Sequence, residues 1–259
     1  MTPDIEKILD IDYLVFSSHK TATQTLRRTL NYTGLECINI HHLPDIGLRG
    51  GDFQGYLDEY LAHNRKKLNV CSVFREPMER HISSFFQGYG TRPIRLKEVS
   101  NEFETIIYKY TIKQLQDKFI QELDDKSLIG IRESLHEICN ELHISVEKLN
   151  YNSKIGYGFH ETENIRLYIF RFDFLINNIE NLLSDITGKK IIKQNANMGS
   201  SKWYKDIYSE FKASLVVPHH TIMDIYESKR DLINLFYLNN YDSILKQAFI
   251  KFGNKSVLG

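Results

Sequence analysis

Basic and hydroxyl-bearing side chains are concentrated in one short stretch, Tyr13–Leu26, which reads YLVFSSHKTATQTL. It starts as an apolar run typical of a buried strand and ends in a helix with Leu26 and Leu30 on one face. A helix N-terminus offers unpaired N–H groups and a partial positive charge, which suit a phosphate or sulfate group. We therefore expect an anion cradle at the C-terminal end of the first strand, with Lys20 at its mouth. Its hydroxyl donors are Thr21, Thr23 and Thr25.

This loop differs from the phosphate loop of nucleotide triphosphatases, G-x-x-x-x-G-K-[ST]. The lysine comes first, and small residues stand where that motif has glycine. Because no acidic residue for Mg²⁺ follows an obvious strand, Mg²⁺-dependent phosphoryl transfer is disfavoured. The alternative interpretation is that Thr21 or Thr23 only caps the helix and that Lys20 is a surface charge.

A second basic element, SVFREPMERHISSFF, covers residues 72–86. Arg75 follows an apolar strand, and Ser83 lies two turns along the next helix. The fork-shaped guanidinium of arginine suits a phosphate group, and a serine can supply a further hydrogen bond. The alternative for Arg75 is an ion pair with Glu76 or Glu79. Two anion elements, each just past a strand, predict a ligand with two separate anionic groups.

Strands alternate with helices along most of the chain, which predicts βαβ units and a mainly parallel sheet. The expected strands are 12–17, 36–40, 68–74 and 165–175, and the expected helices are 23–31, 56–67, 77–89, 176–188, 203–215 and 221–250. We therefore expect one α/β domain over 1–259, with a three-layer, P-loop-like fold and helices flanking the sheet. Helical periodicity predicts an inserted helical cap at about 95–160.

Composition and charge narrow the function classes. The chain has 259 residues and a formal net charge of +0, which argues against general nucleic-acid binding. No secretory signal and no apolar run long enough to cross a membrane is visible, so no integral membrane segment is expected. Cys37, Cys71 and Cys139 have no metal-ligand spacing and are expected to be buried thiols in a reducing cytoplasm.

Four stretches carry a resemblance to the PAPS-dependent sulfotransferases. HKTATQTL resembles their 5′-phosphosulfate loop, P-K-[TS]-x-[ST]-T, and VFREPMERHISSFF resembles their 3′-phosphate element. YIFRFDFLINNIENLLSDITG resembles a late segment of the superfamily, and GSSKWYKDIYSEF resembles a segment of bacterial capsular polysaccharide synthesis proteins. Two departures lie in the loop: His19 stands where the family has proline, and Gln24 interrupts the final hydroxyl pair.

The resemblance implies PAPS as co-substrate, PAP as product and no metal ion. Lys20 would stabilise the leaving oxygen by hydrogen bonding. The loop at 195–204 would complete the nucleotide site. The expected nucleotide-binding residues are His19, Lys20, Thr21, Ala22, Thr23, Gln24, Thr25, Arg75, Ser83, Ser201 and Lys202.

The acceptor hydroxyl must lose a proton, so a general base is expected near the end of a neighbouring strand. His41 and His42 follow the second strand, and histidine titrates near neutral pH. We favour His42 slightly, because alternation directs one of the pair at the core. Glu36 is the third candidate, since related sulfotransferases use a glutamate soon after the first helix.

The function expected from these features is transfer of a sulfuryl group from PAPS to a carbohydrate hydroxyl. The acceptor would be a bacterial capsular or other cell-surface polysaccharide, with peripheral association with the synthesis machinery. Two alternatives stay open: a P-loop-type nucleotide-dependent kinase, and a non-catalytic nucleotide-binding protein of the same fold.

Overall fold

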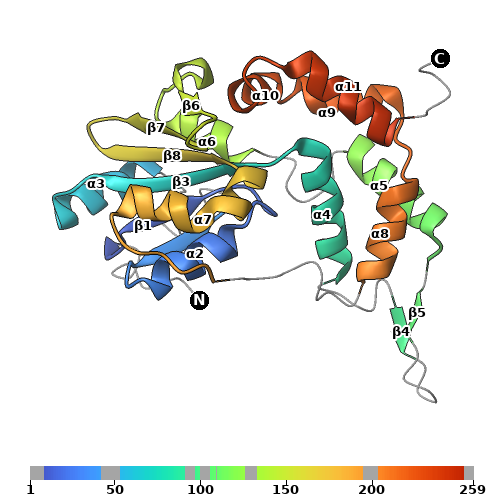
Figure 1. Ribbon diagram of the computed structural model, residues 1–259, viewed down its shortest axis with the longest axis horizontal. Helices are drawn as coiled ribbons and strands as arrows, with labels where there is room; N and C mark the ends of the chain where they lie inside the picture. The colour runs from blue at the N-terminus through green and yellow to red at the C-terminus, as the bar shows by residue number, and fades with distance from the viewer. Residues whose placement is uncertain are drawn as a thin grey trace. The chain divides into compact units, whose positions relative to one another are not determined.

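The computed structural model describes residues 9–41, 53–90, 97–99, 106–108, 110–125, 133–194 and 204–253 (Figure 1). The chain forms two compact units, each assembled from separate segments. The first comprises 1–75, 132–197 and 234–239, and the second comprises 76–131, 198–233 and 240–259.

A six-stranded sheet forms the centre of the first unit, in the order β2-β1-β3-β8-β7-β6. The strands β1 (Tyr13–Phe16), β2 (Cys37–Ile40), β3 (Leu68–Phe74) and β8 (Ile165–Arg171) are parallel. The strands β7 (Tyr157–Glu161) and β6 (Tyr151–Asn152) complete the sheet in antiparallel register. The predicted α/β class with a mainly parallel sheet is therefore confirmed.

Both faces of this sheet are covered by helices, which explains why its inner strands are continuous apolar runs. On one face, alternate strand residues pack against α2 (Thr23–Tyr32) and α7 (Phe172–Thr187). On the other, α3 (Phe53–Asn64) and α6 (Ser134–Glu141) contact β3, and Figure 1 shows α6 and α2 on opposite sides of the sheet. The first face buries Tyr13, Val15, Leu26, Leu30, Cys37, Cys71, Val73, Tyr168, Phe170, Leu175, Ile179, Leu182 and Leu183.

The boundary between β8 and α7 differs from the prediction. The sequence predicts a strand to residue 175, but the strand ends at Arg171 and the helix starts at Phe172. Leu175 and Ile179 are buried one helical turn apart, so this apolar stretch has helical and not strand periodicity. The predicted stop is confirmed, because Gly188 ends α7 with a φ of 68°.

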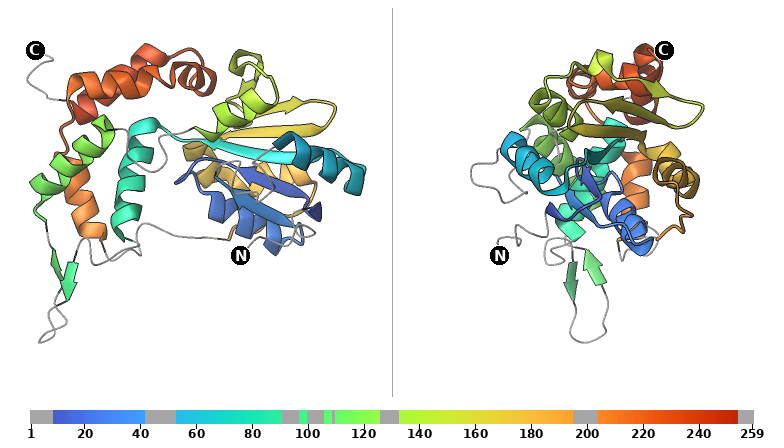
Figure 2. Two further views of the ribbon diagram at one scale, coloured as in Figure 1. Left: turned by 180° about the vertical axis from the view of Figure 1, so that it is seen from behind. Right: turned by 90° about the vertical axis from the view of Figure 1, so that its left-hand side faces the viewer.

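The second unit is built mainly from helices (Figures 1 and 2). Its helices are α4 (Pro77–Gly90), α5 (Ile112–Asp124), α8 (Lys205–Ser214), α9 (His219–Glu227) and α11 (Tyr241–Phe252), and β4 (Lys97–Val99) pairs with β5 (Ile106–Tyr108) as an antiparallel hairpin. Phe211 packs against Phe85, Phe86 and Phe119 at ring-centroid distances of 5.0 to 5.8 Å. This aromatic cluster joins α4, α5 and α8.

Two expected helical regions are more divided than their periodicity suggests. The region 95–160 contains β4, β5, α5, α6, the short helix η3 (Val146–Lys148), β6 and most of β7, and the two units share these elements. The region 221–250 is helical as expected, and turns divide it into α9, α10 (Arg230–Phe236) and α11. Leu238 and Asn239 adopt left-handed φ values of 56° and 59°, which a helix cannot accommodate. No helix within the described ranges is long and apolar enough to cross a membrane.

Candidate functional site

The loop between β1 and α2 has a backbone conformation that usually requires glycine. Lys20 and Ala22 have left-handed φ values of 67° and 65°. This conformation costs about 1 to 2 kcal/mol for a residue with a side chain, so surrounding contacts must hold it. The sequence gives no sign of this strain, because both positions carry ordinary L-residues.

Hydroxyl groups hold the loop from the inside. The Thr21 hydroxyl donates to the Ser18 carbonyl at 2.5 Å and lies 2.8 Å from Ser17 Oγ. Ser17 Oγ in turn donates to the Val73 carbonyl and accepts from the Val73 N–H, each at 3.0 Å. The Thr21 hydroxyl therefore helps to fix the loop to β3 through Ser17, and the Thr21 side chain is buried.

The first turn of α2 carries no side-chain cap. Its N-cap is Ala22, which has no hydrogen-bonding side chain, and no acidic residue lies in the first turn. The initial N–H groups of the helix have no intrahelical acceptor, so this end favours an anion. The predicted Thr23 and Thr25 are buried, whereas Gln24 Nε2 donates to Asn39 Oδ1 of β2 at 3.3 Å.

Arg75 brings the two predicted anion elements together within the first unit. It follows β3, and its Nη1 donates to the Lys20 carbonyl at 2.9 Å. Its guanidinium also lies over the Phe172 ring, 4.4 Å from the centroid. Arg75 thus stabilises the left-handed turn at Lys20 and lies beside the uncapped start of α2.

The two acidic residues considered as ion-pair partners of Arg75 make other contacts in the second unit. Glu79 pairs with Lys212 at 2.7 Å and with Lys251 at 2.5 Å. Glu76 accepts hydrogen bonds from the Glu79 N–H at 2.8 Å and from the Tyr226 hydroxyl. Removal of the Glu76 carboxyl from water raises its pKa to about 7, although these hydrogen bonds favour the ionised form.

His41 lies at the same edge of the sheet as Lys20. Its Nδ1 is 2.8 Å from the Ser17 carbonyl, and its ring lies 3.8 Å from that of His19. Because a carbonyl can only accept, this hydrogen bond requires the proton on Nδ1. In the neutral ring the lone pair is then on Nε2, which is the form that a general base needs.

Glu133 and Ser134 join this cluster, and no sequence motif indicated them. Ser18 Oγ donates to Glu133 Oε1 at 2.9 Å and accepts from the Ser134 N–H at 2.9 Å. Ser134 Oγ donates to the His41 carbonyl at 3.0 Å. The start of α6 therefore connects the loop to His41, and Glu133 places a buried carboxyl in this network.

The remaining predicted residues are not brought to this cluster. Glu36 precedes β2 and is exposed at the amino end of the parallel strands, whereas His41 follows the carboxyl end of β2. Ser83 is half-buried on α4 in the second unit. His42, Ser201 and Lys202 lie outside the described residues.

Comparison of the chain with models of protein families, with curated proteins and with solved structures finds no match.

Proposed function

We propose that the chain is a PAPS-dependent sulfotransferase that acts on a carbohydrate hydroxyl. The observation that carries this proposal is the hydrogen bond from Arg75 Nη1 to the Lys20 carbonyl, at 2.9 Å. It joins an arginine past one parallel strand to an uncapped helix N-terminus past the neighbouring strand. An adjacent guanidinium and helix N-terminus suit a ligand with two anionic groups, such as an adenosine bisphosphate.

The residues of this edge have complementary roles in sulfuryl transfer. The reaction breaks the bond between sulfur and the oxygen bridging to phosphate, and forms a bond between sulfur and the acceptor oxygen. Lys20 would stabilise the negative charge on the bridging oxygen. His41 would take the acceptor proton on Nε2 while the Ser17 carbonyl holds its Nδ1–H. This tautomer supports His41 over the exposed Glu36 as the base.

The finer features of the proposal are a P-loop-like fold, a cytoplasmic setting and a cell-surface polysaccharide as acceptor. The P-loop-like fold is supported by the parallel strands β1, β2 and β3 and by the phosphate-type loop before α2. The three cysteines are free and buried, which supports a reducing compartment. The acceptor class rests on the resemblance of the GSSKWYKDIYSEF segment alone.

Isothermal titration calorimetry with PAP, beside ATP, tests the proposal. We expect PAP to bind and ATP to bind much more weakly. Arg75→Ala should weaken PAP binding by about 1.5 to 3 kcal/mol, the range for hydrogen bonds to charged groups. Arg166→Ala is the matched control, because Arg166 is exposed on β8 and pairs with Glu161.

Failure of PAP to bind the wild-type chain would refute the proposal. Tighter binding of ATP than of PAP, with a requirement for Mg²⁺, would favour a kinase. Equal PAP affinities for Arg75→Ala and Arg166→Ala would remove Arg75 from the nucleotide site.

A further inference from the structure

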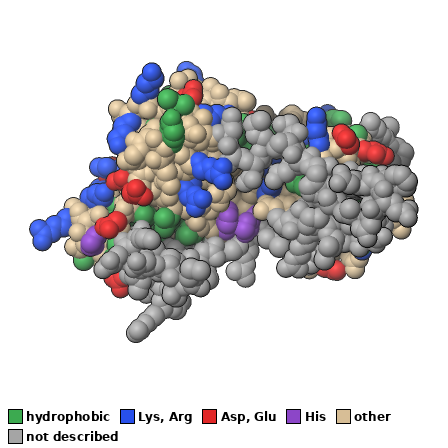
Figure 3. Space-filling model, turned by 90° about the horizontal axis from the view of Figure 1, so that it is seen from below, with side chains coloured by type: hydrophobic (Ala, Val, Ile, Leu, Met, Phe, Trp, Pro, Cys, Tyr) green, Lys and Arg blue, Asp and Glu red, His purple; other side chains and the backbone are tan. Residues whose placement is uncertain are grey.

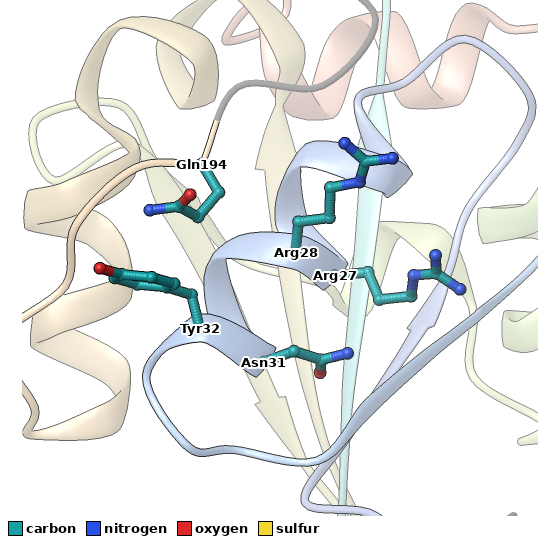
Figure 4. A pocket seen from close by; sticks show the side chains of 5 residues that line it. All are labelled: Arg27, Arg28, Asn31, Tyr32 and Gln194. Carbon is teal, nitrogen blue, oxygen red and sulfur yellow. The ribbon is translucent and has the colours of Figure 1, made fainter.

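An open hollow lies on the first unit beside α2, at a distance along the helix from the Lys20 loop. Its cavity volume is about 320 Å³. Figure 4 shows that four of its lining side chains come from α2 and that the fifth follows α7. These residues are Arg27, Arg28, Asn31, Tyr32 and Gln194.

The five lining residues include two arginines and no acidic residue. Within the described part of the chain, Arg27 and Arg28 form no ion pair and no hydrogen bond. Two neighbouring guanidinium groups without a carboxylate produce a local positive potential, although the whole chain has a formal net charge of +0.

The other three lining residues add neutral donors and an aromatic face. Tyr32 is 63% exposed, so its ring is accessible at the hollow. Asn31 Oδ1 accepts from the Cys37 N–H at 2.8 Å, so its NH₂ group is the part left for a ligand. The backbone N–H of Gln194 donates to Thr29 Oγ1 at 3.0 Å, and one N–H of its side-chain amide donates to the Ile192 carbonyl at 3.4 Å.

Each group matches one part of an acidic sugar. A guanidinium binds a carboxylate or sulfate through paired hydrogen bonds. Side-chain amides donate to and accept from hydroxyl groups. An exposed aromatic ring offers a flat apolar surface with a polar hydroxyl at its edge. Arg28 lies five residues after Thr23, about 7.5 Å along the helix axis, and Asn31 and Tyr32 are the last two residues of α2, so the hollow lies along the second half of this helix.

We propose that this hollow binds an anionic sugar residue of the polysaccharide acceptor. The inference rests on the proposed function, because it identifies the acceptor as an acidic polysaccharide. The hollow would hold one charged residue of the polymer while another residue presents its hydroxyl at the Lys20 loop. The acid can be a uronic carboxylate or a sulfate ester, since both match the guanidinium fork.

A nucleic acid is a poorer match for this surface. Extended binding to a phosphate backbone requires a basic stripe. On the face drawn in Figure 3, acidic side chains are interspersed with those of Lys and Arg. Arg27 and Arg28 line a hollow formed by only five residues, which is a local basic site and not an extended stripe.

Calorimetry with defined oligosaccharides tests this proposal. The probes are an oligogalacturonate, a heparin oligosaccharide and a neutral maltooligosaccharide of the same length. We expect at least one charged probe to bind the wild type and the neutral probe not to bind. The double variant Arg27→Ala/Arg28→Ala should weaken that binding about tenfold or more, because charge-assisted hydrogen bonds are lost.

The matched control is Lys148→Ala/Lys154→Ala, which removes two exposed positive charges near β6, at the other edge of the sheet from β2. It should leave saccharide affinity within about twofold of the wild type, because only diffuse attraction is lost. Arg27→Lys/Arg28→Lys keeps the charge without the fork, and we expect an intermediate affinity. Thermal unfolding of each variant establishes that it is folded.

The proposal would be overturned if Arg27→Ala/Arg28→Ala and Lys148→Ala/Lys154→Ala weakened saccharide binding equally. It would also be overturned if the neutral probe bound as tightly as the charged probes, or if a single-stranded oligonucleotide bound more tightly than they do. The relative affinities of the two charged probes identify the acidic group. PAP titration separates this inference from the proposed function: Arg27→Ala/Arg28→Ala should retain PAP affinity. If the wild type binds a charged saccharide but not PAP, the hollow stands as a saccharide site and the sulfotransferase proposal fails.

Discussion

The Glu76 carboxyl gives a test of the structure that does not depend on any ligand. Glu76 has a pKa of about 7, whereas its ordinary value is 4.5. The folded protein therefore binds this proton more tightly than the unfolded chain does. The stability gained from Glu76 is fully present below the unfolded pKa and is lost as the pH rises through the folded pKa.

The size of the effect follows from the shift. A shift of about 2.5 pKa units at 1.36 kcal/mol per unit corresponds to about 3 kcal/mol between the two protonation states. Glu76→Gln removes this titration and retains an oxygen that can accept from the Glu79 N–H. We therefore expect its free energy of unfolding, relative to the wild type, to increase by up to about 3 kcal/mol from about pH 5 to about pH 8.

Urea unfolding of both proteins across this pH range measures the difference. The contributions of the other titrating groups to the free energy of unfolding cancel in this difference, because the two chains differ at one position. Glu59→Gln, on the exposed face of α3, controls for removal of one negative charge. A wild type that gains stability relative to Glu76→Gln as the pH rises, or a difference that does not change with pH, would refute this reasoning.

The loop and the base give two further predictions. Ala22→Gly should stabilise the protein by up to about 1 kcal/mol, because it relieves a left-handed φ, although glycine adds unfolded-state entropy. Gly34→Ala should destabilise the protein by about 1 kcal/mol, because Gly34 has a φ of +73° and the added Cβ would meet no neighbour that could compensate for the strain. Chemical denaturation measures the change in the free energy of unfolding for both variants. Changes of the same sign in Ala22→Gly and Gly34→Ala would contradict the left-handed conformation of one of these residues. His41→Gln should abolish PAP release from PAPS with any polysaccharide that the wild type turns over, yet retain PAP affinity; unchanged turnover would exclude His41 as the base.

The fold was largely predictable because the inner strands are buried on both faces. A continuous apolar run such as Leu68–Phe74 has one structural interpretation when a helix follows it directly. The start of α7 was not predictable from the same signal, because Phe172 and Phe174 are aromatic and suit a strand equally well. The helix forms because it buries Leu175 and Ile179 together against the sheet.

The candidate site was predictable in its location and less so in its contacts. Lys20 and Arg75 could be placed at one sheet edge, because each follows a parallel strand. The left-handed conformation of Ala22 could not be predicted, since tertiary contacts hold it. Glu133 was missed because its role depends on where α6 begins in three dimensions. Neither Ala22 nor Glu133 belongs to a local sequence pattern that would predict its conformation or its contacts.

The segment 234–239 has a consequence for folding during synthesis. It belongs to the first unit, and Phe236 stacks on Phe74 with ring centroids 5.0 Å apart. Ribosomal synthesis therefore delivers the last part of this core after most of the second unit. The pairing of β3 with β8 also joins strands far apart in the chain. During synthesis the core of the first unit stays incomplete until residues 234–239 have been made. We therefore expect this unit to fold late and slowly and to benefit from a chaperone.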